Sequence, residues 1–264
     1  MIGVFDSGVG GLTAVKALSR LKPGWDITYL GDTARVPYGT RSREVIDRYA
    51  LQACRFLISK EVDAILVACG TVSSNSLPVL RQNFELPITG VVEGASKKAY
   101  ENAMAGNGII AVLGTAATIK SGAYEKEIKK YGGNVRIISR ACPLLVPLVE
   151  NGRTGVDDSL SNIAIAEYLA DIIPKKPAAA ILGCTHYPLL SGIFSLFLPE
   201  SLLINSAEEA AVSLCGLLEK RHIDVGSSGK SVFYVTDDPS GFSKNGKAFL
   251  GKDISDRVYQ ISID

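Results

Sequence analysis

The 264-residue sequence lacks the features that mark membrane proteins, secreted proteins and nucleic-acid binders. No apolar run approaches the roughly 20 residues that a membrane-spanning helix needs, and the first residues have neither the basic start nor the apolar length of a signal peptide. The net charge is only +1 and the basic residues are scattered, so neither nucleic acid nor an anionic membrane is expected as a partner. We therefore expect a cytoplasmic protein that binds a small molecule.

The chain also lacks the cysteine and glycine patterns of disulfide frameworks, metal sites and dinucleotide sites. Its five cysteines are an odd number without C-x-x-C spacing, which in the cytosol indicates reduced thiols. Cys54 and Cys142 are interpreted as structural residues. Gly8 and Gly10 begin a G-x-G-x-x-G pattern, but Thr13 replaces its third glycine. We expect neither a metal nor an organic cofactor.

Short apolar runs alternate with amphipathic stretches along the chain, which is the pattern of an α/β fold. Strands are predicted at 2–5, 27–30, 109–113, 135–138 and 202–204, near 231–235, and in the runs that lead to Cys69 and Cys184. Helices are predicted at 12–18, 41–60, 73–83, 92–105, 124–131, 158–173, 206–220 and 240–250. The glycine-rich turn at 6–11 is interpreted as a binding loop, because glycine lets the backbone approach a ligand closely. The alternative is merely a tight turn from strand to helix.

Two segments of similar length each run from a hydroxyl-rich loop to a cysteine at a strand end. The first runs from Asp6 to Cys69 and the second from Thr115 to Cys184. They indicate an internal duplication, although a chance parallel in a repetitive α/β chain is the alternative. We expect two similar α/β domains with mostly parallel sheets, related by a pseudo-twofold axis, with the active site in the cleft between them. The first domain is predicted at 1–95 plus 208–264 and the second at 96–207.

Cys69 and Cys184 are the strongest candidates for chemistry. Both follow short apolar runs, and open α/β sheets place their chemistry at the carboxyl ends of such buried strands. His186 stands two residues after Cys184, and in an extended chain these two side chains point to the same face. A nearby histidine can lower the pKa of a thiol into the range in which it acts as a general base.

Three uses of the two thiols remain open at this point. They are zinc ligands together with His186, or one is a nucleophile with His186 as its base, or both are bases that face each other across a cleft. The twinned segments favour two bases, because acid–base groups on opposite faces of one carbon invert a stereocentre. An ordinary packed histidine is the alternative for His186.

Four stretches also resemble one family. They are D-S-G-V-G-G-L at 6–12, G-D-T-A-R-V-P-Y-G at 31–39, Ala68 with Cys69, and G-C-T-H-Y-P-L at 183–189. They closely resemble the glutamate racemases of the cofactor-independent aspartate/glutamate racemase superfamily, over nearly the whole chain. The resemblance implies conversion of L-glutamate to D-glutamate for peptidoglycan in a bacterial cytoplasm, without a cofactor. We also expect a homodimer.

The resemblance assigns roles to single residues. It implies that Cys69 and Cys184 are the two catalytic thiols, that Asp6 and His186 are their respective helpers, and that Glu150 lies near the second thiol. The same resemblance places a larger set around the substrate: Asp6, Ser7, Pro37, Tyr38, Gly39, Gly70, Thr71, Thr115, Thr118, Thr185 and His186.

One position departs from the family, which usually shows Cys-Asn-Thr where this chain has Gly70 in the middle. An amide that would hold the substrate is therefore absent. We expect water, a hydroxyl of Ser73 or Ser74, or the side chain of Asn75 to replace it, or the substrate preference to have moved toward aspartate or a related amino acid. A binding relative without turnover is a further alternative, against which the two thiols argue. On this reasoning Gly70→Asn should leave the fold intact and strengthen glutamate binding.

Overall fold

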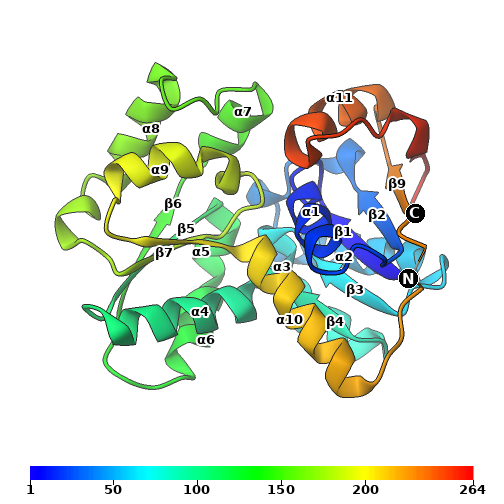
Figure 1. The fold of residues 1–264 in the computed structure, drawn as a ribbon, viewed down its shortest axis with the longest axis horizontal. Coiled ribbons are helices and arrows are strands. Elements are labelled where there is room, and N and C mark those ends of the chain that lie inside the picture. Colours follow the sequence, from blue (N-terminus) through cyan, green and yellow to red (C-terminus); the bar gives the residue numbers. More distant parts are fainter. Residues whose placement is uncertain (227, 264) are drawn as a thin grey trace.

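The computed structural model describes residues 1–226 and 228–263, and it contains two sheets that lie side by side, each with its own helices (Figure 1). Within these residues, the first sheet has six strands in the order β10-β9-β2-β1-β3-β4, and the second has four in the order β6-β5-β7-β8. Every strand pairing between described residues is parallel. The predicted fold class, two α/β domains with parallel sheets, is confirmed.

The elements have the following bounds. The strands of the first sheet are β1 (Ile2–Asp6), β2 (Ile27–Gly31), β3 (Ala64–Val67), β4 (Ile88–Gly90), β9 (Ser231–Val235) and β10 (Val258–Gln260). Those of the second sheet are β5 (Ile109–Gly114), β6 (Arg136–Ala141), β7 (Ala179–Leu182) and β8 (Leu202–Asn205). The helices are α1 (Leu12–Leu21), α2 (Arg43–Ile58), α3 (Gly70–Asn83), α4 (Val91–Ala105), α5 (Ala116–Ser121), α6 (Ala123–Lys129), α7 (Leu145–Glu150), α8 (Ser159–Leu169), α9 (Ser191–Phe197), α10 (Ser206–Arg221) and α11 (Pro239–Leu250). No described helix is long and apolar enough to cross a bilayer.

Both faces of the first sheet are covered by helices. Val4 of β1 belongs to the core that includes residues of α1 and α11, whereas its neighbour Phe5 belongs to the core that includes residues of α2. A strand buried on both faces needs apolar side chains at successive positions instead of an alternating pattern. This explains why β1 and its neighbours read as continuous apolar runs in the sequence.

The two sheets share one local topology. In the first sheet the strands stand in the order β2-β1-β3-β4, and in the second the order is β6-β5-β7-β8. Each cysteine strand, β3 or β7, therefore pairs with the strand that leads to a hydroxyl-rich loop, β1 or β5. Because the carboxyl ends of parallel strands meet at one edge, Cys69 and Cys184 occupy equivalent places in the two halves.

The chain crosses between the sheets twice. Helix α4 begins directly after β4 ends at Gly90, and α10 begins directly after β8 ends at Asn205. The two helices pack against each other, with α4 beside the second sheet and α10 between the two halves of the molecule (Figure 1). The strands thus divide into 2–90 with 231–260, and 109–205. The predicted domain boundaries, 1–95 plus 208–264 and 96–207, stay a prediction.

Some short elements differ from the sequence predictions. The turn expected around Thr115 is the start of α5, because Thr115 Oγ1 accepts a hydrogen bond from the Thr118 N–H and caps the helix. Helix α3 begins at Gly70, three residues before the predicted start. Helix α9 and strand β10 were not predicted.

Tyr29 of β2 fixes the loop that follows β1. Its buried hydroxyl donates to the Gly8 carbonyl oxygen at 2.6 Å, and its ring packs against Phe233 and Phe242. Tyr29→Phe keeps the ring and leaves that carbonyl without this partner. We expect a loss of about 1–3 kcal/mol in the free energy of unfolding, measured by urea denaturation. Tyr259→Phe, at a half-exposed ring, is the matched control and should change stability by less than about 0.5 kcal/mol. Equal stability of the two variants would contradict this role.

Candidate active site

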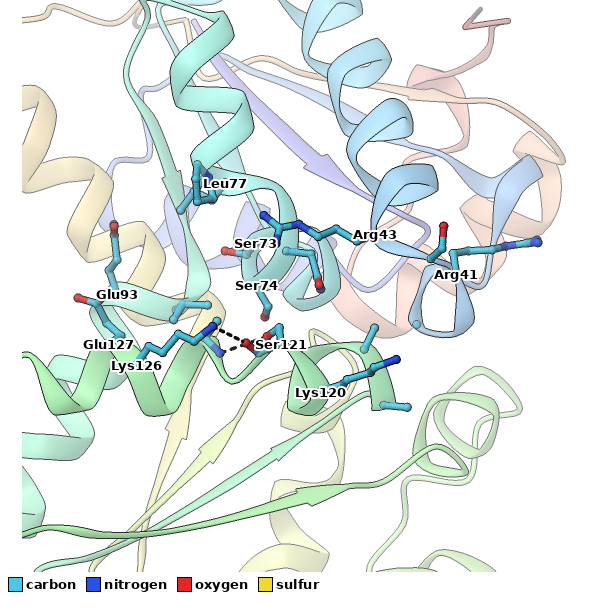
Figure 2. Close-up of a pocket in the computed structure, with 18 of the residues that line it drawn as sticks. Arg41, Arg43, Ser73, Ser74, Leu77, Glu93, Lys120, Ser121, Lys126 and Glu127 are labelled. Carbon is cyan, nitrogen blue, oxygen red and sulfur yellow. Dashed lines mark hydrogen bonds between the residues drawn. The ribbon is translucent and has the colours of Figure 1, made fainter.

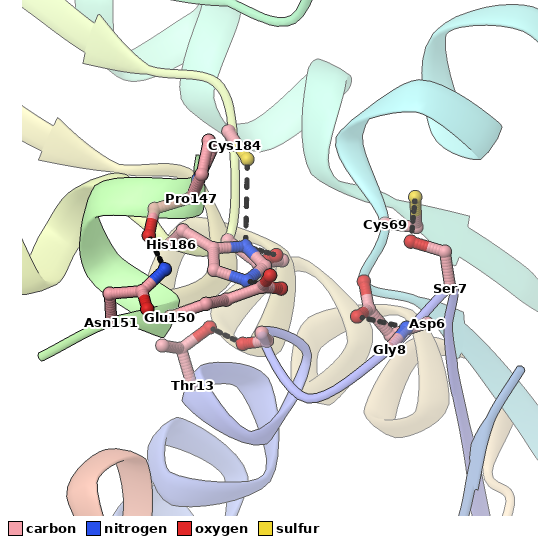
Figure 3. A network of polar contacts seen from close by, with 12 residues as sticks. Asp6, Ser7, Gly8, Thr13, Cys69, Pro147, Glu150, Asn151, Cys184 and His186 are labelled. Atoms are coloured by element: carbon pink, nitrogen blue, oxygen red, sulfur yellow. Dashed lines mark hydrogen bonds and ion pairs between the residues drawn. The ribbon is translucent and has the colours of Figure 1, made fainter. Parts of the chain in front are cut away.

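The two thiols face each other across the boundary between the domains. Cys69 directly precedes α3 and acts as its N-cap residue, and Cys184 lies two residues after β7. Both side chains are buried, with exposed fractions of 5% and 6%. Figure 3 shows their sulfur atoms on opposite sides of one site. A small molecule bound between them would have one thiol on each side.

Cys69 lies in a buried and weakly polar environment. Its Sγ donates to Ser7 Oγ at 3.5 Å. Burial, and then the charge of Asp6, raise the pKa of the Cys69 thiol to about 12, although the hydrogen bonds with the Ser7 hydroxyl and the Val72 N–H act to lower it. Cys69 is therefore a protonated thiol at neutral pH, which makes it a proton donor in the resting state.

Asp6 lies beside Cys69 at the end of β1. Its Oδ2 accepts a hydrogen bond from the Gly8 N–H at 3.0 Å, whereas its buried Oδ1 has no hydrogen-bond partner among the described residues. Burial raises the pKa of this carboxyl group, and the nearby charge of His186 opposes the shift. Asp6 thus lies where a proton can be held close to the first thiol.

Cys184 is the first member of a polar chain within the second domain. His186 Nδ1 lies 3.8 Å from Cys184 Sγ and 3.4 Å from Thr185 Oγ1, while His186 Nε2 lies 3.0 Å from Glu150 Oε1 at the end of α7 (Figure 3). Burial disfavours the charged imidazole, but the hydrogen bonds to Cys184 and Glu150 outweigh it and raise the pKa of His186 to about 10. An imidazolium at this place stabilises negative charge on the neighbouring sulfur.

Hydroxyl groups from both domains meet next to the thiols. Thr71 Oγ1, in the first turn of α3, lies 3.0 Å from Thr115 Oγ1, and Thr115 Oγ1 lies 3.0 Å from Thr118 Oγ1. A Cβ built on Gly39 would lie 3.1 Å from the Thr115 side chain, so the 38–40 turn also contacts this group. The structure thus gathers Gly39, Thr71, Thr115 and Thr118, all expected around the substrate.

The other two residues expected from the 31–39 stretch, Pro37 and Tyr38, stay predictions as substrate-binding residues. Pro37 is exposed, and the Tyr38 hydroxyl donates to the buried carboxylate of Asp32. Asp32 also accepts from Arg35 Nε at 2.6 Å and from Thr236 Oγ1 at 2.9 Å. Sequence reasoning missed this network, although an acid three residues before an arginine in a loop is a recognisable signal. Its effect is to fix the turn that carries Gly39.

The glycine-rich loop after β1 contacts the second domain. A Cβ on Gly10 would lie 2.3 Å from Thr185 Oγ1 and 2.6 Å from His186 Nδ1. The Thr13 N–H, which the predicted binding loop would offer to an anion, donates to the Gly10 carbonyl oxygen at 3.0 Å. In this structure the glycine therefore makes room for the loop that follows Cys184.

The sequence-based expectation for Gly70→Asn is wrong for this structure. A Cβ on Gly70 would lie 2.2 Å from the carbonyl oxygen of Gly183, which is a backbone atom of the second domain. Any side chain at this position therefore displaces one of the two loops. The first consequence of adding an amide is a collision, not an added hydrogen bond to a ligand.

The side chains expected to replace the missing amide are also engaged. Ser74 Oγ donates to the Gly70 carbonyl oxygen at 2.5 Å, and Asn75 Nδ2 donates to the Thr71 carbonyl oxygen at 2.8 Å. Ser73 Oγ accepts from the Val91 N–H at 2.8 Å and so joins α3 to α4. These contacts arise because α3 starts at Gly70, which places all three polar residues within a helix.

A cavity of about 920 Å³ opens beside the thiols, between the 39–44 segment and α3 of the first domain and α5 and α6 of the second (Figure 2). Neither thiol lines it, but Gly39 and residues next to Thr115 do. Six basic and three acidic side chains surround it: Arg41, Arg43, Arg81, Lys120, Lys126 and Lys130, with Glu44, Glu93 and Glu127. The cavity therefore carries an excess of positive charge. Within residues 1–226 and 228–263, no group of three or more His, Cys, Asp or Glu side chains is arranged to hold a metal ion.

Comparisons with known proteins agree over nearly the whole length. The family model for Asp/Glu/Hydantoin racemase matches residues 13–213. The chain is similar to a glutamate racemase of Persephonella marina, with 42% identity over 96% of this chain and 94% of the relative. It is also similar to the crystal structure of a glutamate racemase from Bacillus anthracis, with a TM-score of 0.93, 32% identity, and 99% and 97% of the two chains covered. A glutamate racemase from Francisella tularensis in complex with D-glutamate has a TM-score of 0.91 and 35% identity over 100% and 97% of the chains.

The charge of His186 can be measured directly, since the chain has only two histidines. In NMR titrations of the imidazole rings, His186 should stay protonated through pH 8, with the exposed His222 as the second signal. Glu150→Gln removes the negative charge that faces the imidazolium and should lower the pKa of His186. A neutral His186 ring at pH 7 in the unaltered protein would contradict the polar chain described above.

The same shift makes stability depend on pH in one direction. The pKa of His186 is about 10 in the folded protein and has an ordinary value of 6.5, so protonation favours the folded state. Its contribution is complete below about pH 6.5 and is lost as the pH rises toward about 10. The difference in unfolding free energy between the unaltered protein and His186→Asn should therefore shrink over this interval in urea denaturation. A difference that grows with pH would have the wrong sign.

Proposed function

The chain belongs to the Asp/Glu/hydantoin racemase family and is an amino-acid racemase of the cofactor-independent kind, and we propose that it interconverts L-glutamate and D-glutamate with Cys69 and Cys184 as acid and base. The observation that carries this proposal is the pair of buried thiols at equivalent strand ends of two domains, on opposite sides of one site. Two such groups invert a carbon centre when one removes a proton and the other delivers one from the opposite face.

The surroundings of the two thiols suit opposite tasks. Cys69 rests as a thiol, because burial raises its pKa to about 12, while His186 Nδ1 lies 3.8 Å from Cys184 Sγ, where an imidazolium favours negative charge. In the proposed step Cys184 takes the Cα proton of L-glutamate, which breaks the C–H bond and forms an S–H bond. Cys69 gives its proton to the other face of Cα and becomes the thiolate. The reverse sequence converts the D isomer.

Each thiol has its own assisting groups in this mechanism. Asp6 lies beside Cys69, and burial raises the pKa of its carboxyl group. By holding a proton when Cys69 is a thiolate, Asp6 keeps two negative charges from lying side by side. His186 lies beside Cys184 and is oriented by Glu150 at 3.0 Å. Thr71, Thr115, Thr118, Thr185 and Ser7 supply hydroxyl groups around the substrate.

An acidic substrate also fits the charges at the neighbouring cavity. Glu93 and Glu127 are paired with Arg81 and Lys130, so the remaining basic side chains exceed the acidic ones at its walls. A cleft lined by one sign of charge raises the local concentration of ions of the opposite sign. This feature and the glutamate racemases among the similar proteins favour glutamate. Aspartate is the second candidate, because Gly70 alters the substrate side of the site.

The wider role proposed for the enzyme is to supply D-glutamate for peptidoglycan in a bacterial cytoplasm. The described cysteines are all free thiols, and the chemistry needs two of them reduced, which a reducing compartment provides. Depletion of the protein should make cells require external D-glutamate. Cell fractionation would show whether the protein is in the cytoplasm. Growth without D-glutamate after depletion would separate the enzyme from this role.

A homodimer is also part of the proposal, supported by an apolar patch on the second domain. The patch consists of Val156, Leu160 and Ile163 on or before α8 and Leu196 on α9, with exposed fractions between 49% and 64%. Helices α8 and α9 pack together, and Val156 lies against Gly192 of α9, so the four side chains share one region of the surface. Contiguous exposed apolar side chains of this kind mark contact surfaces.

Variants of the cysteines test the reaction. Protein dialysed against a chelator and assayed without added cofactor should racemise glutamate faster than aspartate. Cys69→Ala and Cys184→Ala should each abolish turnover in both directions, because every turnover uses one thiol as base and the other as acid. A loss of about 10²–10⁴-fold or more is expected for each. Cys54→Ala, at a buried thiol outside the site, is the matched control and should stay active.

Isotope exchange separates two bases from one. In deuterated water the product isomer should acquire solvent deuterium, while the recovered substrate should not at early times, since a thiol carries only one proton. Deuterium in recovered substrate at the rate of product formation would indicate a single base. Near-normal racemisation by Cys69→Ala or Cys184→Ala would also indicate a single base.

The proposed homodimer has a separate test. Ile163→Asp places a charge in the centre of the patch and should shift sedimentation from dimer to monomer. Val212→Asp, at a similarly exposed apolar side chain on α10, is the control and should leave the dimer unchanged. A monomeric unaltered protein at micromolar concentration would contradict the proposal.

A further inference from the structure

Gly70 is the point at which the two catalytic loops meet backbone to backbone. It follows Cys69 and is the first residue of α3, while Gly183 precedes Cys184 after β7. A Cβ built on Gly70 would lie 2.2 Å from the Gly183 carbonyl oxygen, 3.3 Å from its carbonyl carbon and 3.7 Å from Cys184 Cα. The space that a side chain would occupy is therefore filled by the loop of the other domain.

The need for glycine at this position is steric and not conformational. Gly70 has helical backbone as the first residue of α3 and is absent from the glycines with positive φ. Other amino acids adopt such a backbone freely, and alanine within a helix is normally more stable than glycine. The backbone conformation therefore does not require glycine here, and the three described atoms nearest to the built Cβ all belong to the second domain.

Gly183 cannot retreat within its own domain. Its N–H donates to the Leu113 carbonyl oxygen at 2.8 Å, and a Cβ on Gly183 would lie 2.8 Å from that same oxygen and 3.1 Å from the Tyr124 ring. The loop is thus packed against β5 and α6 from behind. A group added at Gly70 therefore cannot be accommodated by a shift of Gly183 toward β5 and α6, and one of the two loops must be displaced in another direction.

Other contacts between the domains depend on the same approach. Gly10 accepts the side chains of Thr185 and His186 in the space where its own side chain would lie, and Thr71 Oγ1 meets Thr115 Oγ1 at 3.0 Å. Thr71 is the neighbour of Gly70 in the chain, and Thr185 and His186 follow Cys184, so these contacts involve the same two loops. Separation at Gly70 therefore loosens the surroundings of both cysteines.

We propose that Gly70 is a positioning residue that sets the distance between the two thiol loops, because the backbone of Gly183 occupies the place where a side chain at residue 70 would begin. The closed site of this chain is built from contact between two glycines. A side chain at residue 70 separates the loop of Cys69 from the loop of Cys184, whatever polar group it carries. The link from this geometry to turnover rests on the proposed function, whereas the steric statement does not.

The test compares Gly70→Ala and Gly70→Asn with the unaltered full-length protein. Iodoacetamide is added, and the alkylation rate of each cysteine is followed by peptide mass spectrometry. In both variants iodoacetamide should alkylate Cys69 or Cys184 at least about tenfold faster, because displaced loops expose thiols that are now buried. Turnover should fall about 10²-fold, which is the typical cost of a displacement of roughly 1 Å between reacting groups. Glutamate kcat should fall similarly in the two variants, since both collide through the same first atom.

Three comparisons decide the outcome. Gly216→Ala, at an exposed helical glycine whose Cβ would meet no described atom within 4 Å, should leave alkylation and kcat unchanged. Buried Cys54 is an internal reference, and faster alkylation there as well would indicate general loosening and overturn the proposal. Unchanged alkylation of both active-site thiols, or a Gly70→Asn enzyme as active as the unaltered one, would also overturn it. If the unaltered protein fails to racemise glutamate while the alkylation rates rise as expected, the proposed function fails and the steric role stands.

Discussion

The removal of water from ionisable groups between the two domains is the constraint on which the site depends. Asp6, Cys69 and His186 are each at most 6% exposed, so a charge on any of them must be stabilised by a neighbour. Cys69 has only the Ser7 hydroxyl and one backbone N–H for this purpose, and it stays protonated. His186 has Glu150 and Cys184, and it stays charged. Both groups therefore keep their protons, but for different reasons: burial keeps Cys69 neutral, whereas hydrogen bonds to Glu150 and Cys184 outweigh burial and keep His186 charged.

Four strands of each sheet share one order, but the side chains at their carboxyl ends differ. The shared strand order places the two cysteines at equivalent strand ends, and this topology alone sets a pair of thiols against each other. The loops then differ, because a carboxyl group lies at the end of β1 whereas Thr115 occupies the corresponding place after β5, and the histidine follows only Cys184. A shared strand order therefore places the two cysteines in different surroundings, with a carboxyl group beside Cys69 and an imidazolium beside Cys184.

Much of the architecture could be predicted because buried parallel strands are continuous apolar runs, as in β1, β2 and β5. The edge strand β10 was missed, since Tyr259 and Gln260 are exposed and leave no such run. Cys184 and His186 were found because their interaction is local in the sequence. The contact between Gly70 and Gly183 could not be found in this way, because it joins distant residues and depends on how closely the two domains approach.

The first sheet is built from two distant parts of the chain, and this affects the order in which the protein can fold during synthesis. Strand β9 covers β2, with Phe233 beside Tyr29, yet it follows the whole second sheet in the sequence. Until β9 emerges from the ribosome, β2 is an open edge that can pair with another chain. The second sheet is continuous in sequence and needs no later segment. The half that contains Cys184 can therefore be complete before the half that contains Cys69, and the nascent chain passes through a stage with one finished domain and one exposed edge.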